Sequence, residues 1–267
     1  MNILEKIIET KRREVAESKT VVPLSTIATR RLYNRSTYSL VKILKTSDSL
    51  NIISEYKRAS PSKGLINISK STPESVATGY QKYGAAAISV LTDTQYFKAD
   101  KNDFSTIRNC TSIPLLRKEF IIDAYQIHEA KAMGADVILL IGAVLKKSES
   151  ESFVNIAHDL EMEVLYEIHG KEEIDKMPHN VDIVGINNRD LKTFTVDYQH
   201  SISMLEMLPA EYPKISESGI SNTNTIVELH KSGFNGFLIG EAFMKVDNPS
   251  HAFHDFITEC HSKLNEI

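Results

Sequence analysis

Residues 52–64 of the chain read Ile-Ile-Ser-Glu-Tyr-Lys-Arg-Ala-Ser-Pro-Ser-Lys-Gly. The stretch begins as an apolar, β-branched run and ends in a Ser-Pro-Ser-Lys-Gly turn that continues neither a strand nor a helix. Because strand side chains alternate, Glu55 and Lys57 lie on the same side of the strand's end. Taken alone, they are typical of a solvated surface ion pair. Charge at a strand's end, before an irregular loop, is also how α/β enzymes build sites. Whether Glu55 and Lys57 belong to a site therefore depends on which residues end the other strands.

The chain from Leu50 onward alternates strand and helix patterns. Thr72-Pro73 and Asn248-Pro249 predict helix starts, because each places an N-cap before a proline at the first helical position. Ser148 to Glu151 has the spacing of a capping box. Near-continuous apolar runs are typical of parallel strands buried on both faces, and they predict strands at 85–91, 113–118, 136–141, 163–167, 182–187, 213–217 and 236–240.

Eight strands with alternating helices predict right-handed crossovers and a closed (β/α)8 TIM barrel. An open doubly wound sheet is the alternative. Residues 3–18 carry apolar side chains at helical spacing, and residues 40–44 predict a second short helix before the first strand. The basic run at residues 11–13 is interpreted as a solvated helix face. We therefore expect one domain over residues 1–267, with a helical extension at 1–49 and the barrel at 50–267.

Composition excludes several classes of function. The 267 residues include 31 basic and 35 acidic side chains, for a net charge of −4. This balance does not indicate a basic surface that binds nucleic acid. Cys110 and Cys260 lack metal or redox spacing and indicate a reduced, cytoplasmic protein. The first residues do not resemble a signal peptide, and no apolar run approaches the ~18 residues that span a membrane. We expect a cytoplasmic protein that binds neither nucleic acid nor membrane.

Polar residues recur at the ends of the predicted strands. A barrel brings the carboxyl ends of its strands together on one face, and that face is where barrel enzymes catalyse their reactions. One polar strand end needs no functional explanation, but many converging on one face favour a catalytic site. The residues at these ends are Glu55, Lys57, Asp93, Lys118, Glu167, Asn187, Arg189, Glu217, Ser218 and Gly240.

Three residues suggest the chemistry of this face. Lys118 is expected to be partly desolvated near acids, either holding a proton for delivery or forming an imine. Glu167 is a candidate general base. His169 is interpreted as structural, and the remaining histidines show no spacing for metal ligands.

The last two predicted strands favour a phosphate site. Gly219 follows the seventh strand, and Gly240 ends the eighth before a short helix. Barrels often bind phosphate with these two loops, using glycine for close backbone approach and N–H groups at a helix start. Glu241 would contribute its backbone N–H and not its carboxylate.

With these residues assembled, the chain resembles indole-3-glycerol-phosphate synthase, from tryptophan biosynthesis, over about residues 40–244. The resemblance rests on separate motifs in the family's order. They are residues 52–64, Ser-Val-Leu-Thr-Asp at 89–93, Leu-Leu-Arg-Lys-Glu-Phe-Ile-Ile-Asp at 115–123, Glu-Ile-His at 167–169, Gly-Ile-Asn-Asn-Arg-Asp-Leu at 185–191, Ser-Glu-Ser-Gly-Ile at 216–220 and Leu-Ile-Gly-Glu-Ala-Phe-Met at 238–244.

The resemblance implies ring closure of 1-(2-carboxyphenylamino)-1-deoxyribulose 5-phosphate with loss of carbon dioxide and water, without metal or organic cofactor. It implies that Lys118 is the general acid that protonates the ketone. Glu167 would be the base for dehydration, with Glu55 helping or competing. Lys57 would contact substrate anions or donate the dehydration proton.

The resemblance also implies the binding residues. Ser60, Asn187, Arg189 and Glu217 would orient the carboxylate and the sugar hydroxyls, and Ser218 is a further candidate. Lys57, Gly219, Gly240 and Glu241 would hold the phosphate, and Phe97 and Phe120 would flank the aromatic ring. The N-terminal extension would pack over the mouth of the site, and we expect a monomer.

Two residues depart from those usual in the family, Tyr56 and Glu119, and we expect neither to carry chemistry. Three other functions stay open. A class I aldolase would use Lys118 to form an imine, and phosphoribosylanthranilate isomerase would need a cysteine or aspartate acid–base pair. A non-catalytic binder would have no use for Glu55, Lys118 and Glu167 together.

Overall fold

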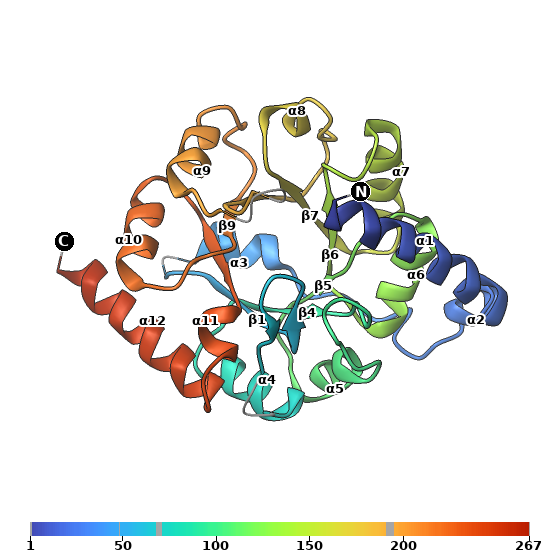
Figure 1. The fold of residues 1–267 in the computed structure, drawn as a ribbon, viewed down its shortest axis with the longest axis horizontal. Coiled ribbons are helices and arrows are strands. Elements are labelled where there is room, and N and C mark those ends of the chain that lie inside the picture. The colour runs from blue at the N-terminus through green and yellow to red at the C-terminus, as the bar shows by residue number, and fades with distance from the viewer. Residues whose placement is uncertain (1, 48, 68–70, 191–194, 267) are drawn as a thin grey trace.

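The computed structural model describes residues 2–47, 49–67, 71–190 and 195–266, and within them eight parallel strands close a barrel (Figure 1). The first strand, β1, pairs with both β4 and β10, which closes the sheet and confirms the barrel over the open alternative. The barrel strands are β1 (Ile52–Tyr56), β4 (Ala87–Leu91), β5 (Leu115–Lys118), β6 (Val137–Ile141), β7 (Glu163–Ile168), β8 (Ile183–Asn187), β9 (Lys214–Glu217) and β10 (Gly236–Ile239).

Helices surround the barrel and begin where capping residues place them. Thr72 accepts a hydrogen bond from the N–H of Ser75, and Asn248 accepts one from the N–H of His251, so both predicted caps are confirmed. The predicted cap at Ser148 is wrong, because Glu149 accepts the N–H of Lys146 and α7 starts earlier. The helices after β1 are α4 (Pro73–Lys82), α5 (Asp103–Cys110), α6 (Ala124–Met133), α7 (Lys147–Asp159), α8 (Lys171–Ile174), α9 (Tyr198–Leu205), α10 (Thr223–Lys231), α11 (Glu241–Met244) and α12 (Pro249–Asn265).

The interior of the barrel is filled with apolar side chains. They include Ile53, Ala87, Leu116, Leu139, Leu165, Ile183, Ile215 and Leu238, all buried. Burying one large aliphatic side chain stabilises a fold by about 1.5–3 kcal/mol, so this packing is a substantial part of the core energy. A ligand therefore binds only at an end of the barrel. In the part of the chain that the structure describes, none of the helices combines the length and the apolar character that crossing a membrane requires.

The N-terminal extension covers both ends of the barrel. Its helices are α1 (Ile3–Val21), α2 (Leu24–Ala28) and α3 (Leu40–Thr46). The expected packing over the active-site face is provided by α1, drawn in dark blue in Figure 1, because Ile3, Leu4 and Ile7 line the cavity there. In contrast, α3 closes the opposite end. Its first two N–H groups, at Leu40 and Val41, donate to Glu163 at the start of β7, and its leucines join the interior cluster.

The turn after β1 is a small hairpin. Ala59 pairs with Leu65, and Ser60 with Gly64, in the antiparallel strands β2 (Ala59–Ser60) and β3 (Gly64–Leu65). Gly64 has φ +67°, a left-handed conformation that glycine adopts without steric cost. The predicted turn is thus confirmed, and it projects the intervening residues over the carboxyl end of the barrel.

Candidate active site

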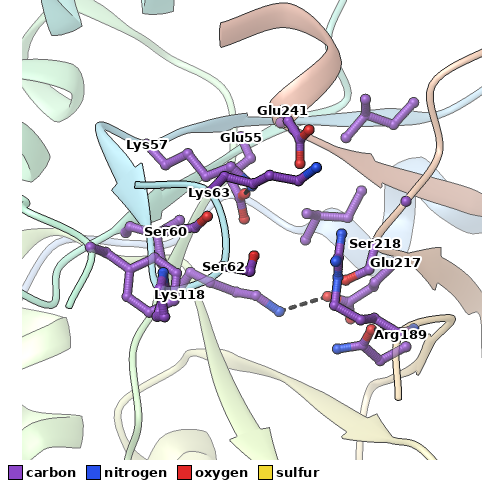
Figure 2. A pocket seen from close by; sticks show the side chains of 18 of the residues that line it. Glu55, Lys57, Ser60, Ser62, Lys63, Lys118, Arg189, Glu217, Ser218 and Glu241 are labelled. Atoms are coloured by element: carbon purple, nitrogen blue, oxygen red, sulfur yellow. Dashed lines mark hydrogen bonds and ion pairs between the residues drawn. The ribbon is translucent and has the colours of Figure 1, made fainter. Parts of the chain in front are cut away.

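A cavity of about 550 Å³ lies at the carboxyl ends of the strands (Figure 2). It is lined by all of the residues that the sequence analysis assigned to catalysis or binding, which are Glu55, Lys57, Ser60, Phe97, Lys118, Phe120, Glu167, Asn187, Arg189, Glu217, Ser218, Gly219, Gly240 and Glu241. Asp93, the remaining strand-end residue, lies outside this lining and is buried beneath α1.

Lys118 is the centre of the site. Extending from the end of β5, its Nζ donates to Glu167 Oε2 at 2.7 Å and to Glu217 Oε2 at 2.6 Å. The two carboxylates come from the ends of β7 and β9 and are only 4% and 1% exposed. Figure 2 shows the lysine reaching across the cavity to Glu217. The barrel thus brings together three charges that lie 49 and 99 residues apart in the sequence.

This arrangement separates the pKa values of the two carboxylates. Burial opposes ionisation of Glu167, but the Lys118 ammonium outweighs it and lowers the pKa of Glu167 to about 2. Burial dominates at Glu217 and raises its pKa to about 7, with the Glu167 charge adding to the rise. Burial also opposes the charge on Lys118, yet the carboxylates of Glu167 and Glu217 raise the pKa of the lysine overall. At neutral pH the cluster holds a charged lysine and an ionised Glu167.

A second ion pair occupies the end of β1. Lys57 Nζ donates to Glu55 Oε1 at 2.7 Å, and Ser89 donates to the other carboxylate oxygen at 3.4 Å. The close approach of Glu55 to β10 depends on Gly240, because a Cβ at that residue would lie 2.6 Å from Glu55 Oε1. Glycine at position 240 therefore leaves room for the Glu55 side chain, in addition to the expected contact of its backbone with an anion.

Asn187 connects the acid–base cluster to the loop after β8. Its side-chain Nδ2 donates to Glu167 Oε1 at 3.3 Å, and its Oδ1 accepts the backbone N–H of Arg189 at 3.0 Å. Arg189 lines the cavity on this side. Leu191, the last residue of the motif that begins at Gly185, lies outside the described residues.

Two aromatic rings form one wall of the cavity. The rings of Phe97 and Phe120 lie 6.1 Å apart between centroids and are inclined by 40°. They come from the loops after β4 and β5. An apolar wall of this kind suits a flat aromatic group, which gains about 0.5–1.5 kcal/mol from ring contacts beyond its area burial.

The opposite end of the cavity offers backbone and cationic groups. Ser218 and Gly219 adopt positive φ angles of 70° and 77°, so the chain turns sharply after β9. Lys63, from the hairpin, extends toward Glu241 in Figure 2, and Lys245 also lines the cavity. The sequence analysis missed both lysines, although Lys63 belongs to the turn that it singled out.

His169 is a further residue that the sequence analysis did not assign to the site. Its Nε2 lies 3.5 Å from Glu167 Oε1 and its Nδ1 lies 3.6 Å from Glu173 Oε2. Burial opposes protonation, but the two carboxylates outweigh it and raise the pKa of His169. Because His169 lies just past the end of β7, strand alternation alone does not predict that its side chain lies beside Glu167.

The sequence is similar to those of known proteins along nearly its whole length. A family model described as indole-3-glycerol phosphate synthase matches residues 4–256. The chain belongs to the indole-3-glycerol phosphate synthase family. Relatives with that name include a protein from Bacteroides thetaiotaomicron, 40% identical over 96% of this chain and 98% of its own length. Another, from Alkaliphilus metalliredigens, is 41% identical over 92% of this chain and 94% of its own length.

Solved structures of more distant proteins share the fold of this indole-3-glycerol phosphate synthase family member. Tryptophan synthase subunit alpha from Legionella pneumophila superposes with a TM-score of 0.62 at 12% identity, over 85% of this chain and 97% of that one. Thiamine phosphate pyrophosphorylase from Pyrococcus furiosus gives a TM-score of 0.57 at 18% identity, over 79% of this chain and 96% of that one. At such low identity these similarities support the fold alone.

Proposed function

We propose that this cavity closes the indole ring of 1-(2-carboxyphenylamino)-1-deoxyribulose 5-phosphate, with Lys118 as the general acid and Glu167 as the general base. Family membership places the chain among the lyases of tryptophan biosynthesis. The observation that carries the assignment of roles is the contact of one buried lysine with two carboxylates whose pKa values differ.

The first step needs an acid at the ketone of the substrate. As the ring carbon that bears the carboxylate attacks the ketone carbon, the carbonyl oxygen becomes an alkoxide. An alkoxide is a stronger base than either Glu167 or Glu217, so the Lys118 proton moves to it even though the carboxylates raise the pKa of the lysine. Loss of carbon dioxide then restores the aromatic ring.

The second step removes the new hydroxyl as water and needs an acid and a base. Glu167 is ionised at neutral pH and takes the proton that is lost from the ring system. Lys57, 2.7 Å from Glu55, is a further cation in the lining of the cavity, and the pair supplies or accepts the remaining proton. Asn187 keeps Glu167 in place through the contact at its other oxygen.

The ends of the cavity match the ends of the substrate. The rings of Phe97 and Phe120 flank the aromatic group, while Ser60, Asn187, Arg189, Glu217 and Ser218 orient the carboxylate and the hydroxyls. The backbone at Gly219, Gly240 and Glu241 holds the phosphate together with Lys57. Lys63, whose side chain extends toward the same end, adds a further cation for this anion.

The test is turnover of the anilino-deoxyribulose phosphate, followed by indole absorbance or fluorescence, in the wild type and in Lys118→Ala. We expect the variant to lose about a thousandfold in kcat, within the range that a general acid contributes. Inhibition by inorganic phosphate serves as the control and should stay unchanged, because the phosphate end of the cavity is intact. A kcat within tenfold of the wild type would show that Lys118 is not the acid.

The aldolase alternative makes a different prediction for the same lysine. An imine requires a neutral amine, whereas the carboxylates of Glu167 and Glu217 raise the pKa of Lys118 and keep it protonated. Borohydride added during turnover should therefore leave Lys118 unlabelled in a mass spectrum. Covalent labelling of Lys118 would favour the imine mechanism.

We also propose that residues 1–49 and 50–267 function as one domain, as a cytoplasmic monomer that takes a phosphorylated small molecule and no nucleic acid. The contacts of α1 and α3 with the two ends of the barrel support the single domain. The free thiols of Cys110 and Cys260 suit a reducing compartment. Light scattering coupled to gel filtration measures the mass directly, and a dimer mass would contradict the monomer.

A further inference from the structure

Lys11, on α1, is a buried cation outside the lining of the cavity. The sequence analysis interpreted residues 11–13 as solvated, which is correct for the exposed Arg12 and Arg13 but wrong for Lys11, whose exposed fraction is 5%. Its side chain points toward the barrel because it follows Ile7 at a spacing of four residues, on the same face of the helix. Burial of a lysine requires compensating charge.

Two barrel carboxylates supply that charge. Lys11 Nζ lies 3.0 Å from Asp93 Oδ2, after β4, and 3.1 Å from Glu119 Oε1, after β5. A third carboxylate, Glu14 on α1 itself, lies at 2.7 Å. Burial opposes the charge on Lys11, but Glu119 and Asp93 raise the pKa of the lysine, so it is protonated at neutral pH.

The same two carboxylates hold the loops that carry the aromatic wall. Asp93 Oδ1 accepts the backbone N–H of Phe97 at 3.1 Å and that of Tyr96 at 2.6 Å. Glu119 Oε1 accepts the N–H of Phe120 at 2.9 Å. One ammonium group therefore connects, through one carboxylate each, to the backbone of both phenylalanines whose rings line the cavity.

The lysine is what keeps these carboxylates together. Asp93 is fully buried and Glu119 is 4% exposed, so without a cation between them they would repel each other in a low-dielectric environment. Glu119 also accepts from the hydroxyl of Thr92 at 2.7 Å, which ties the end of β5 to the end of β4. A change at Lys11 is thus transmitted to both loops at once.

We propose that Lys11 is a positioning residue that sets the spacing of Phe97 and Phe120 for the aromatic ring of the substrate. The inference rests on the proposed function, in which that ring packs against the wall formed by the two phenylalanines. Lys11 itself touches no substrate. The N-terminal helix thereby determines how well one end of the substrate is bound, in addition to covering the mouth of the cavity.

Two probes separate this role from a general loss of structure. N-methylanthranilate represents the carboxyphenylamino end of the substrate, and inorganic phosphate represents the other end. In Lys11→Met we expect the KM of the substrate and the inhibition constant of N-methylanthranilate each to rise about tenfold, which corresponds to a loss of about 1.4 kcal/mol of binding free energy. The kcat should fall less than threefold, and inhibition by phosphate should not change.

The controls use neighbouring positions. Arg12→Met removes an exposed cation from the same turn of α1 and should leave all four constants within twofold of the wild type. Lys11→Arg keeps the charge and should restore the KM to within threefold. If Lys11→Met does not fold, Glu119→Gln tests the same link, because it weakens the attraction to Lys11 while the amide oxygen still accepts from Phe120; its KM should rise about threefold.

The outcomes distinguish this inference from the proposed function. A wild type without turnover would overturn the proposed function, and the inference with it. Constants of Lys11→Met within twofold of the wild type would overturn the inference alone. Equal weakening of both probes would also overturn it, because Lys11 would then support the whole site and not the aromatic wall. An unchanged KM in Glu119→Gln would do the same.

Discussion

Two buried clusters in this protein place one lysine between two barrel carboxylates, and they differ in how completely their hydrogen bonds are satisfied. In the cluster under α1, Lys11 pairs with Asp93 and Glu119, and backbone N–H groups donate to both acids. In the cavity cluster, Lys118 pairs with Glu167 and Glu217. There Glu217 Oε1 is buried without a hydrogen-bond partner among the described residues.

The comparison shows what distinguishes a structural ion cluster from a reactive one. The carboxylates under α1 accept hydrogen bonds from the backbone of their own loops as well as the contact with Lys11, so their positions are fixed. In the cavity, the donors come mainly from side chains, and the pKa values of the two carboxylates are driven apart. Unsatisfied acceptors and separated pKa values are the features expected of groups that exchange protons during a reaction.

The largest difference between the two clusters is expected when one carboxylate in each is neutralised and the kcat values of the two variants are compared. Glu167→Gln removes the proposed base and should lower kcat about a hundredfold, within the range that a general base contributes. Glu14→Gln, in the cluster under α1, neutralises a group equally close to its lysine, at 2.7 Å, and should leave kcat within twofold. Steady-state kinetics of both variants makes the comparison, and equal losses would mean that the clusters do not differ in role.

A smaller effect is expected from crowding Glu217. Gly185 on β8 has no side chain, and a Cβ there would lie 2.1 Å from Glu217 Oε1. Gly185→Ala should push the carboxylate away from Lys118 and lower kcat about tenfold, since a misplacement of about 1 Å in a site can cost up to about a hundredfold. Gly84 has a positive φ, and a Cβ there would meet no other atom within 4 Å. Gly84→Ala is therefore a control that strains the backbone but crowds no side chain. A wild-type kcat in Gly185→Ala would show that the position of Glu217 is not critical.

The smallest effect concerns stability and pH. Burial raises the pKa of Glu217 to about 7 from an ordinary value of 4.5. Its favourable contribution to folding is therefore present below pH 4.5 and is lost as pH rises through about 7, where the fold must bury a charge that the unfolded chain keeps in water. Glu217→Gln avoids this loss. Between pH 5 and pH 8 the shift changes the free energy of unfolding by about 2–3 kcal/mol. The Tm of Glu217→Gln relative to the wild type should therefore rise by about 5–10 °C over that interval.

Circular dichroism melts at the two pH values measure this difference. Glu14→Gln is the control, since it lies in the other cluster and its side chain is 35% exposed. A difference in Tm between Glu217→Gln and the wild type that does not change with pH would contradict the raised pKa of Glu217.

The site could be predicted from the sequence to the extent that it lies at strand ends. Lys118 and Glu167 each close a predicted strand, and a barrel brings such ends together. His169 and Lys63 needed the three-dimensional structure, because one lies just past its strand and the other in a hairpin. The role of Lys11 could not be predicted, since its partners are 82 and 108 residues away in the sequence.

The sequence by itself determined the barrel, the family and most of the residues that line the cavity, because apolar runs, helix caps and strand-end motifs are local properties of the chain. Only the tertiary structure decided which charges meet. Closing the barrel placed Lys118 between Glu167 and Glu217, and docking α1 placed Lys11 between Asp93 and Glu119. Burial and mutual distance set the pKa of a charged group, and neither quantity exists until the strands and helices have packed.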